Sequence, residues 1–250
     1  MSLISTIIFS TVVGFLPAMF WLYYWLQEDK KNPEPAIAIF STFFYGMLAV
    51  PAALVVQYTV NVLILQGRDI SNLFFTNYAP AIITLIIWAS TEEILKYIAA
   101  HKGGLSKKDN NEPLDPIIYM ITAALGFSAL ENTLFIFAPF LTGDTVTALL
   151  TGNMRFIGAS LLHVSASGII GMFLAFAFYK SKKVKKRYLY YGVFLSIALH
   201  TIFNSFIIRG DNFTLLGFVS VWVSIVVIIM LFEKVKKIYK PINKPTNYEK

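Results

Sequence analysis

Long apolar runs alternate with short polar segments along the whole chain. A helix needs about 20 mostly apolar residues to cross a bilayer, so runs of that length predict membrane-spanning helices. Seven runs reach it: 2–26, 36–65, 78–100, 116–140, 153–179, 188–208 and 213–232. The second run is long for one span and contains Pro51, which favours a kink or a tilt. The pattern predicts an all-α polytopic membrane protein, a bundle of about seven transmembrane helices.

The composition excludes a soluble globular domain and a disordered chain. Hydrophobic residues make up 56% of the sequence and charged residues 14%, whereas a soluble domain carries about 25% charged residues. The segments between the apolar runs are short, so we expect a single transmembrane domain over 1–250. The first run lacks a basic leading stretch and a cleavage site, and we interpret it as a retained span. Cysteine is absent, which excludes a disulfide, a thiolate metal site and a cysteine nucleophile.

Basic residues are concentrated in every second polar segment. Of the 21 Lys and Arg residues, 17 lie in the segments 28–35, 101–115, 180–187 and 233–250. The positive-inside rule places these segments in the cytoplasm, which predicts the N-terminus outside and the C-terminus inside. The net charge of +7 is therefore a topology signal first. It also favours contact with anionic lipids at the cytoplasmic face, and we expect no binding of nucleic acid.

Few ionisable residues remain inside the predicted spans, and they fall on four consecutive ones. A carboxylate at the bilayer centre costs at least about 2.5–3.5 kcal/mol, so such residues call for a functional explanation. They are Glu92, Glu93 and Lys96 in the third span, Glu131 in the fourth, His163 in the fifth and His200 in the sixth. At about 1.5 Å per helical residue, all lie near mid-membrane, where they can converge on one buried cavity. The alternative is a structural network of hydrogen bonds between helices.

Helical spacing separates the two adjacent glutamates. Glu92 and Glu93 diverge by about 100° around a helix, so only one can point squarely at a reacting centre. Lys96 can reach either carboxylate, and its pairing with Glu92 has the better Glu-to-Lys orientation four residues apart. That pairing leaves Glu93 slightly favoured as a general base. Arg155 lies near the outer end of its span, and we expect it to extend to the membrane interface.

Residues of these types can hydrolyse a peptide bond in two ways. Water attack needs a base, a group that polarises the carbonyl and a proton donor for the leaving amine. His163, His200 and Glu131 match a zinc set of two histidines and a carboxylate with an open water position. Without a metal, the histidines would polarise the carbonyl and donate the proton, and Glu131 would fix a histidine tautomer. Asn204, one turn from His200, would stabilise the oxyanion or orient that imidazole.

Four short motifs, in order along the chain, resemble those of the PrsW family of intramembrane proteases. The segment Glu92-Glu93-Ile-Leu-Lys96 resembles the family's E-E-x-x-K motif. Phe127-Ser-Ala-Leu-Glu131-Asn132 is similar to the second motif. His163 and the segment His200-Thr-Ile-Phe-Asn204 look like the third and fourth.

The resemblance implies a membrane-embedded endopeptidase of the bacterial plasma membrane, with a catalytic core at about 78–208. The expected catalytic residues are Glu92, Glu93, Glu131, His163, His200 and Asn204, and the expected ligands, only if a metal is used, are His163, His200 and Glu131. The family is often called metal-dependent, whereas the related CAAX prenyl proteases look like metal-free glutamate proteases, so zinc is expected in one version only. Founding members are associated with site-one cleavage of an anti-sigma factor under envelope stress. This implies a single-span membrane protein as substrate.

Two other functional classes stay open on the sequence alone. Intramembrane Glu, Lys and His residues also build proton relays in transporters and channels. The chain has no repeated half and no pair of interrupted helices, which many transporters show. A catalytically inactive family member would act as a membrane binding or immunity protein, although all four motifs are intact. Oligomeric state and regulation have no signal in the sequence.

Overall fold

Every regular element is helical in a computed structural model of the chain, which describes residues 2–30, 32–76 and 78–238. The α-helices are α1 (Leu3–Glu28), α2 (Ala36–Val60), α3 (Ile70–Thr76), α4 (Tyr78–Ala100), α5 (Asp115–Leu141), α6 (Thr145–Met154), α7 (Ser160–Phe176), α8 (Lys182–Arg209) and α9 (Asp211–Val235). Three π-helical segments continue them: η1 (Asn61–Leu65), η2 (His101–Leu105) and η3 (Arg155–Ala159). The prediction of an all-α fold is confirmed.

Six stretches of helix in the described residues are long and apolar enough to cross a membrane. They are Leu3–Glu28, Ala36–Leu65, Asp115–Leu141, Thr145–Phe176, Lys182–Arg209 and Asn212–Val235. The predicted third span coincides with α4, which carries Glu92, Glu93 and Lys96 and is not one of the six. The chain is an integral membrane protein, and its orientation across the bilayer stays a prediction.

Two predicted boundaries are wrong, and each error has a physical reason. The fifth span begins at Thr145 rather than at 153, because Asp144 caps α6 by accepting the N–H of Thr147 at 3.0 Å. The threonines of this first turn look like a polar loop in the sequence. The sixth helix begins at Lys182 and includes most of the basic segment 180–187, since Lys and Arg are good helix formers. The part of the basic tail after 238 lies outside the described residues.

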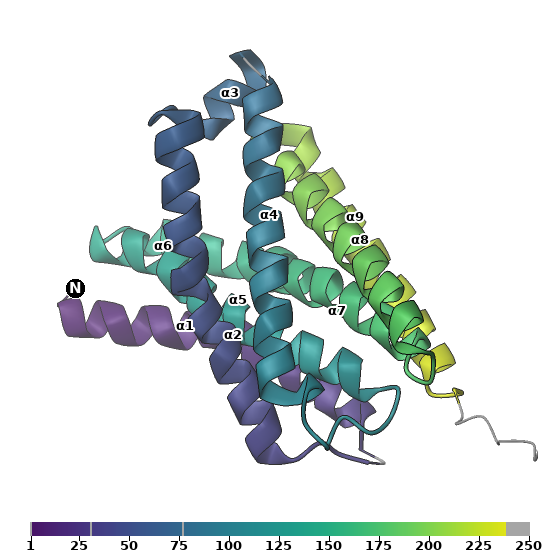
Figure 1. Cartoon of the computed structure of the whole chain (residues 1–250). Helices are drawn as coiled ribbons and strands as arrows, with labels where there is room; N and C mark the ends of the chain where they lie inside the picture. Colours follow the sequence, from purple (N-terminus) through teal and green to yellow (C-terminus); the bar gives the residue numbers. More distant parts are fainter. Residues whose placement is uncertain (1, 31, 77, 239–250) are drawn as a thin grey trace, which may run out of the picture.

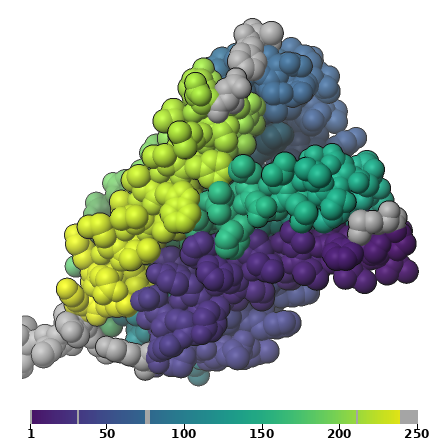
Figure 2. Space-filling model, turned by 180° about the vertical axis from the view of Figure 1, so that it is seen from behind, coloured from purple at the N-terminus to yellow at the C-terminus, as the bar shows by residue number. Residues whose placement is uncertain are grey.

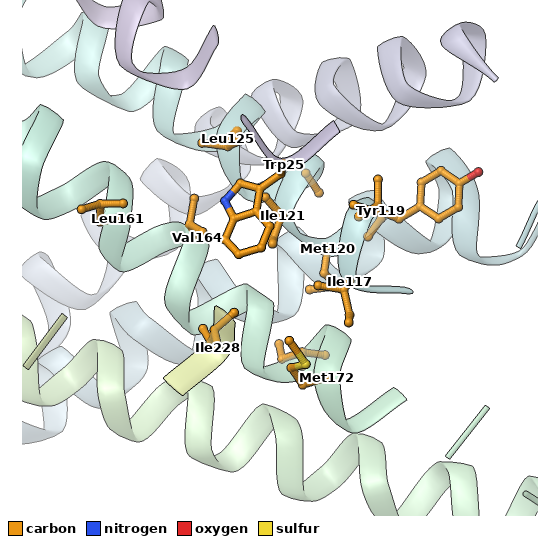
Figure 3. Close-up of a cluster of buried hydrophobic side chains, with 14 of the residues drawn as sticks. Trp25, Ile117, Tyr119, Met120, Ile121, Leu125, Leu161, Val164, Met172 and Ile228 are labelled. Atoms are coloured by element: carbon orange, nitrogen blue, oxygen red, sulfur yellow. The ribbon is translucent and has the colours of Figure 1, made fainter. Parts of the chain in front are cut away.

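Helix α5 is the centre of the bundle, and its residues 117–129 are buried without exception. A helix that is apolar all round is typical of a core position. Helices α1, α2 and α7 pack against it. Figure 3 shows Trp25 of α1 among Ile121, Leu125 and Val164, within the buried cluster that joins α1, α5 and α7.

The remaining helices surround this core in two sets. Helices α2 and α4 run side by side with α3 across one end, and α8 and α9 run together at the other side (Figure 1). Figure 2 shows α9 across the opposite face and α6 alongside α1, where Gly152 lies close to Val13. Helices α4, α5, α7 and α8 thereby meet, and these are the elements that carry the ionisable residues.

Candidate active site

A cavity of about 550 Å³ opens among residues of α2, α4, α5, η3, α7, α8 and α9. Its walls are mainly apolar and aromatic, and include Trp88, Phe135, Met154, Phe203, Ile207 and Phe218. Its polar lining consists of Gln57, Glu92, Glu131, Arg155, His163, His200, Asn204 and Thr214. A few converging polar groups in an apolar cavity are typical of a ligand or active site.

Glu93 is fully buried, and hydrogen bonds saturate its carboxylate. Its Oε1 accepts from the Lys96 ammonium at 2.7 Å and lies 2.8 Å from His200 Nδ1. Its Oε2 accepts from the hydroxyls of Ser167 at 2.8 Å and Ser196 at 3.1 Å. These contacts compensate the cost of burying the charge. Glu93 is not among the described residues that line the cavity.

Glu92 lines the cavity and keeps one oxygen unpaired. Its Oε1 accepts from the Gln57 amide at 3.0 Å. Its Oε2 lies 3.5 Å from Lys96 Nζ and 3.6 Å from His200 Nε2, and it makes no hydrogen bond with the described residues. The expected ion pair of Lys96 with Glu92 is present, but Lys96 lies closer to Glu93 and donates its hydrogen bond there, so the expectation that Glu93 is the freer carboxylate is wrong.

Hydrogen-bond partners fix the proton positions on both histidines. His200 Nδ1 faces the Glu93 carboxylate, so it carries a proton, and in the neutral imidazole Nε2 has a lone pair. His163 lies 2.7 Å from Lys96 Nζ through Nδ1 and 2.9 Å from Glu131 Oε2 through Nε2. Because an ammonium only donates and a carboxylate only accepts, His163 is neutral with its proton on Nε2.

Glu131 lines the cavity and joins His163 to Arg155. Its Oε2 accepts from the Arg155 guanidinium as well as from His163 Nε2. Arg155 also donates to the side-chain oxygen of Asn132 and stacks 4.1 Å from the centre of the Phe135 ring. The expectation that Arg155 extends to the membrane interface is wrong, because its guanidinium pairs with Glu131 inside the bundle.

The structure brings the sequence-predicted residues together from α4, α5, α7 and α8. Asn204 lines the cavity one turn from His200, as the spacing indicates. The contacts that sequence reasoning missed include those from Gln57 to Glu92 and from Ser196 to Glu93. Gln57 is a polar residue within an apolar run, which is a usable signal, whereas Ser196 has none.

Three buried side chains are placed to hold a metal ion. Glu92, His163 and His200 each offer one ligand atom, and these atoms lie within 4.8 Å of one another. The unpaired Glu92 oxygen and the lone pair on His200 Nε2 are donors that zinc accepts. His200 also contacts a carboxylate through its other nitrogen, as metal-bound histidines usually do, whereas His163 has Lys96 at one nitrogen and Glu131 at the other. Glu131 bonds to His163 and is outside this cluster.

Buried carboxylates and neutral histidines around a cavity among membrane helices are the groups that an intramembrane hydrolase needs. A family model described as "PrsW family intramembrane metalloprotease" matches residues 34–232. The chain belongs to this family, and the resemblance seen in the four motifs is confirmed.

The curated relatives that the chain matches are bacterial and are called Protease PrsW. The protein of Geobacillus kaustophilus is 28% identical over 202 residues, which cover 80% of each chain. The protein of Clostridioides difficile is 25% identical over 77% of this chain and 75% of its own length. The protein of Bacillus subtilis is 23% identical over 80% of this chain and 83% of its own length. No solved structure matches the chain.

Proposed function

We propose that this protease hydrolyses a peptide bond of a single-span membrane protein with a water molecule that Glu92 activates. The observation that carries the proposal is Glu92 Oε2, which has no hydrogen-bond partner among the described residues and lies 3.6 Å from His200 Nε2. Both residues line the same cavity, and with a neutral His200 both atoms are acceptors. A water molecule that donates one hydrogen to each would satisfy both.

Different residues around the proposed water molecule would carry out the successive steps of hydrolysis. As the water oxygen bonds to the carbonyl carbon, Glu92 takes the water proton. The proton then passes to the amide nitrogen as the C–N bond breaks, which leaves a carboxylate and an amine. The Asn204 amide, in the same lining, would donate to the carbonyl oxygen as it becomes negative. Glu93 would hold His200 through Nδ1, so Glu92 replaces Glu93 as the favoured base.

The donor set also fits a metal ion, as the family description implies. Glu92, His163 and His200 would hold it. A bound zinc ion polarises a carbonyl and lowers the pKa of water. Glu93 and Glu131 would keep their task of orienting the histidines. The Lys96 ammonium, 2.7 Å from both His163 Nδ1 and Glu93 Oε1, would remain on Glu93.

The cavity walls support an apolar peptide segment as substrate. A transmembrane helix must unwind locally to expose a peptide bond, and its freed backbone groups then need partners. Asn204 and Thr214 place polar groups along a mainly apolar lining. A membrane-anchored anti-sigma factor is the specific substrate that the family resemblance implies.

The distribution of basic residues supports an orientation in the bacterial plasma membrane. With the N-terminus outside, the basic start of α8 would lie at the cytoplasmic face, against anionic lipids. Reporter fusions after residues 108 and 184 should read cytoplasmic, and fusions near 70 and 144 external. Cytoplasmic readings at both 70 and 144 would overturn this orientation.

Cleavage of a single-span reporter by the purified protein tests the proposed reaction. Glu92→Gln keeps the shape and removes the base, so cleavage should stop while the protein stays folded. Glu233→Gln is the matched control, because Glu233 lies at the exposed end of α9 and pairs with Lys236. Full activity of Glu92→Gln would eliminate Glu92 as the base. Absence of cleavage by the wild type on a panel of apolar single-span reporters would contradict the function itself.

Removal of metal tests whether the proposed hydrolysis depends on a bound metal ion. We expect a chelator to abolish cleavage and zinc to restore it, with one bound ion that Glu92→Gln and His200→Ala both lose. An active enzyme that elemental analysis finds free of metal would exclude this version. The same activity would leave the Glu92-based hydrolysis in place.

A further inference from the structure

Arg155 stands at an unusual point of the helical scaffold. It is the first residue of η3, where the helix widens into a π-helical turn between α6 and α7. Such turns within α-helices are frequent at functional sites. The side chain is only 14% exposed and reaches three residues of α5, Glu131, Asn132 and Phe135.

Side chains from two helices, α5 and α7, orient the Asn132 amide that Arg155 contacts. The Asn132 amide donates to Ser128 Oγ at 3.2 Å and to Ser160 Oγ at 3.0 Å. Ser160 is the first residue of α7, so these bonds tie α5 to α7. The Asn132 oxygen is thereby fixed as an acceptor for Arg155. The guanidinium stays protonated, so it always acts as a hydrogen-bond donor. Glu131 accepts its second hydrogen bond.

The Glu131 oxygen that accepts from Arg155 is the one that His163 contacts. Because Oε2 accepts from the guanidinium, it is held as an acceptor 2.9 Å from His163 Nε2. The imidazole then keeps its proton on Nε2, and its Nδ1 lone pair faces Lys96. We propose that Arg155 is a positioning residue that acts through Glu131 to fix the tautomer and orientation of His163. For its catalytic readout this inference rests on the proposed hydrolysis.

Steady-state kinetics on the single-span reporter give the first test. Arg155→Met keeps the aliphatic part of the side chain and removes the guanidinium group. We therefore expect kcat to fall at least about tenfold while KM changes less than about threefold. Glu131→Gln should cause a similar loss. The double variant should be no slower than Glu131→Gln, because both changes remove one pathway. Arg155→Lys keeps the charge and should recover part of the loss.

Arg209 provides the matched control. Its guanidinium stacks 3.8 Å from the centre of the Phe213 ring, as Arg155 stacks on Phe135, but it does not line the cavity. Arg209→Met should therefore keep the wild-type kcat. The proposal is overturned if Arg155→Met is as active as Arg209→Met. The proposal would also be overturned if the losses of kcat in Arg155→Met and Glu131→Gln multiply in the double variant, or if Arg155→Met raises KM alone.

A second readout needs no substrate. The chain has three histidines, so isotope-labelled histidine spectra can be assigned with His163→Asn and His200→Asn. His163 should show the Nε2-protonated tautomer in the wild type and a mixture in Arg155→Met. An unchanged tautomer in Arg155→Met would overturn the proposal. If the wild type cleaves nothing, the proposed function fails, while the tautomer result still decides the role of Arg155. If the Met variant does not fold, Arg155→Lys and Glu131→Gln decide by the same spectra.

Discussion

Glu92 and Glu93 are chemically identical neighbours whose surroundings give them different tasks. Glu93 receives Lys96, Ser167 and Ser196 and faces His200 Nδ1, so it has no lone pair to offer a water molecule. Glu92 accepts one hydrogen bond, from Gln57, and its second oxygen is buried without a hydrogen-bond partner among the described residues. A base must have a free lone pair within reach of the proton that it removes. The contacts therefore favour Glu92.

Gln57 should matter for rate more than for stability. Its amide anchors Glu92 Oε1 at 3.0 Å, and a hydrogen bond to an ionised group is roughly twice as strong as one between neutral groups. Gln57→Leu should therefore lower kcat by roughly tenfold or more with little change in melting temperature. Gln27→Leu, in α1 and away from the cavity lining, is the control. Equal rates for the two variants would remove Gln57 from the site.

Lys96 is predicted to stabilise the fold as well as the site. It is fully buried and bonds to Glu93 and His163, with its ammonium 4.5 Å from the Phe127 ring centre. Lys96→Met leaves Glu93 charged without its ion pair, which costs about 3–5 kcal/mol in buried sites. Thermal unfolding in detergent should show this loss, and Lys96→Met combined with Glu93→Gln should regain part of it. A double variant less stable than Lys96→Met would refute the pairing.

At this scale the sequence indicates which residues gather but not how they pair. Lys96 is three residues from Glu93 and four from Glu92, and a helix permits both contacts. His163 and His200, from α7 and α8, decide between them in the folded protein. The direction of Arg155 was equally undetermined, since an arginine near a span end can reach the interface or a buried carboxylate.

Helices α2 and α5 approach each other at two glycines. A Cβ atom at Gly46 would lie 2.1 Å from the carbonyl oxygen of Ala123, and one at Gly126 would lie 2.0 Å from that of Phe43. Gly46→Ala must therefore push the two backbones apart. We expect a lower melting temperature and lower activity, because α2 carries Gln57.

Gly217→Ala is the matched control for this prediction. The atoms nearest to a Cβ at Gly217 are 3.4 Å away, an ordinary contact. Alanine gains about 1 kcal/mol of helix propensity over glycine, so this variant should melt at or above the wild-type temperature. If Gly46→Ala and Gly217→Ala have the same melting temperature, the close approach of α2 and α5 is not required for stability.

Apolar runs predict helices well and their irregularities poorly. The run 78–100 matches α4 at both ends, because hydrophobicity and helix coincide there. The turn η3 has no counterpart in the apolar pattern, since a π-helical turn depends on packing and not on hydropathy. The short helix α3 lies between apolar runs and was not predicted for the same reason.

For the whole molecule, the cost of charge in lipid was enough to predict that four helices converge. Glu92, Glu131, His163 and His200 do line one cavity. The same argument could not predict that α2 and α9 complete its wall, because their lining residues are mostly apolar. Apolar residues at lipid-facing and cavity-facing positions look alike in sequence.

A second group of acids, buried or half-buried, lies at the ends of the spans and in their connections, and it sets the expected pH dependence of stability. Asp29 follows α1 and is 2% exposed. Burial, with repulsion from Glu112 and Asp115, raises the pKa of Asp29 from 3.8 to about 7. Burial also raises the pKa of Glu34, in the α1–α2 connection. Among the described residues, none of these four acids has a Lys or Arg ion pair.

The raised pKa of Asp29 means that the folded protein holds a proton that the unfolded chain releases near pH 3.8. The stability from this proton is present below that pH and is lost as pH rises through about 7. Asp29→Asn mimics the protonated form, so it should melt above the wild type at pH 8 and close to it at pH 5.

Asp144→Asn is the contrasting variant, because the hydroxyl and N–H of Thr147 lower the pKa of Asp144. That variant should change stability little and to the same extent at both pH values, because asparagine caps a helix about as well as aspartate and the cap of α6 is ionised at both. Equal destabilisation of Asp29→Asn at pH 5 and pH 8 would mean that Asp29 is already ionised in the folded protein, and the acidic group would then not be the origin of the pH dependence.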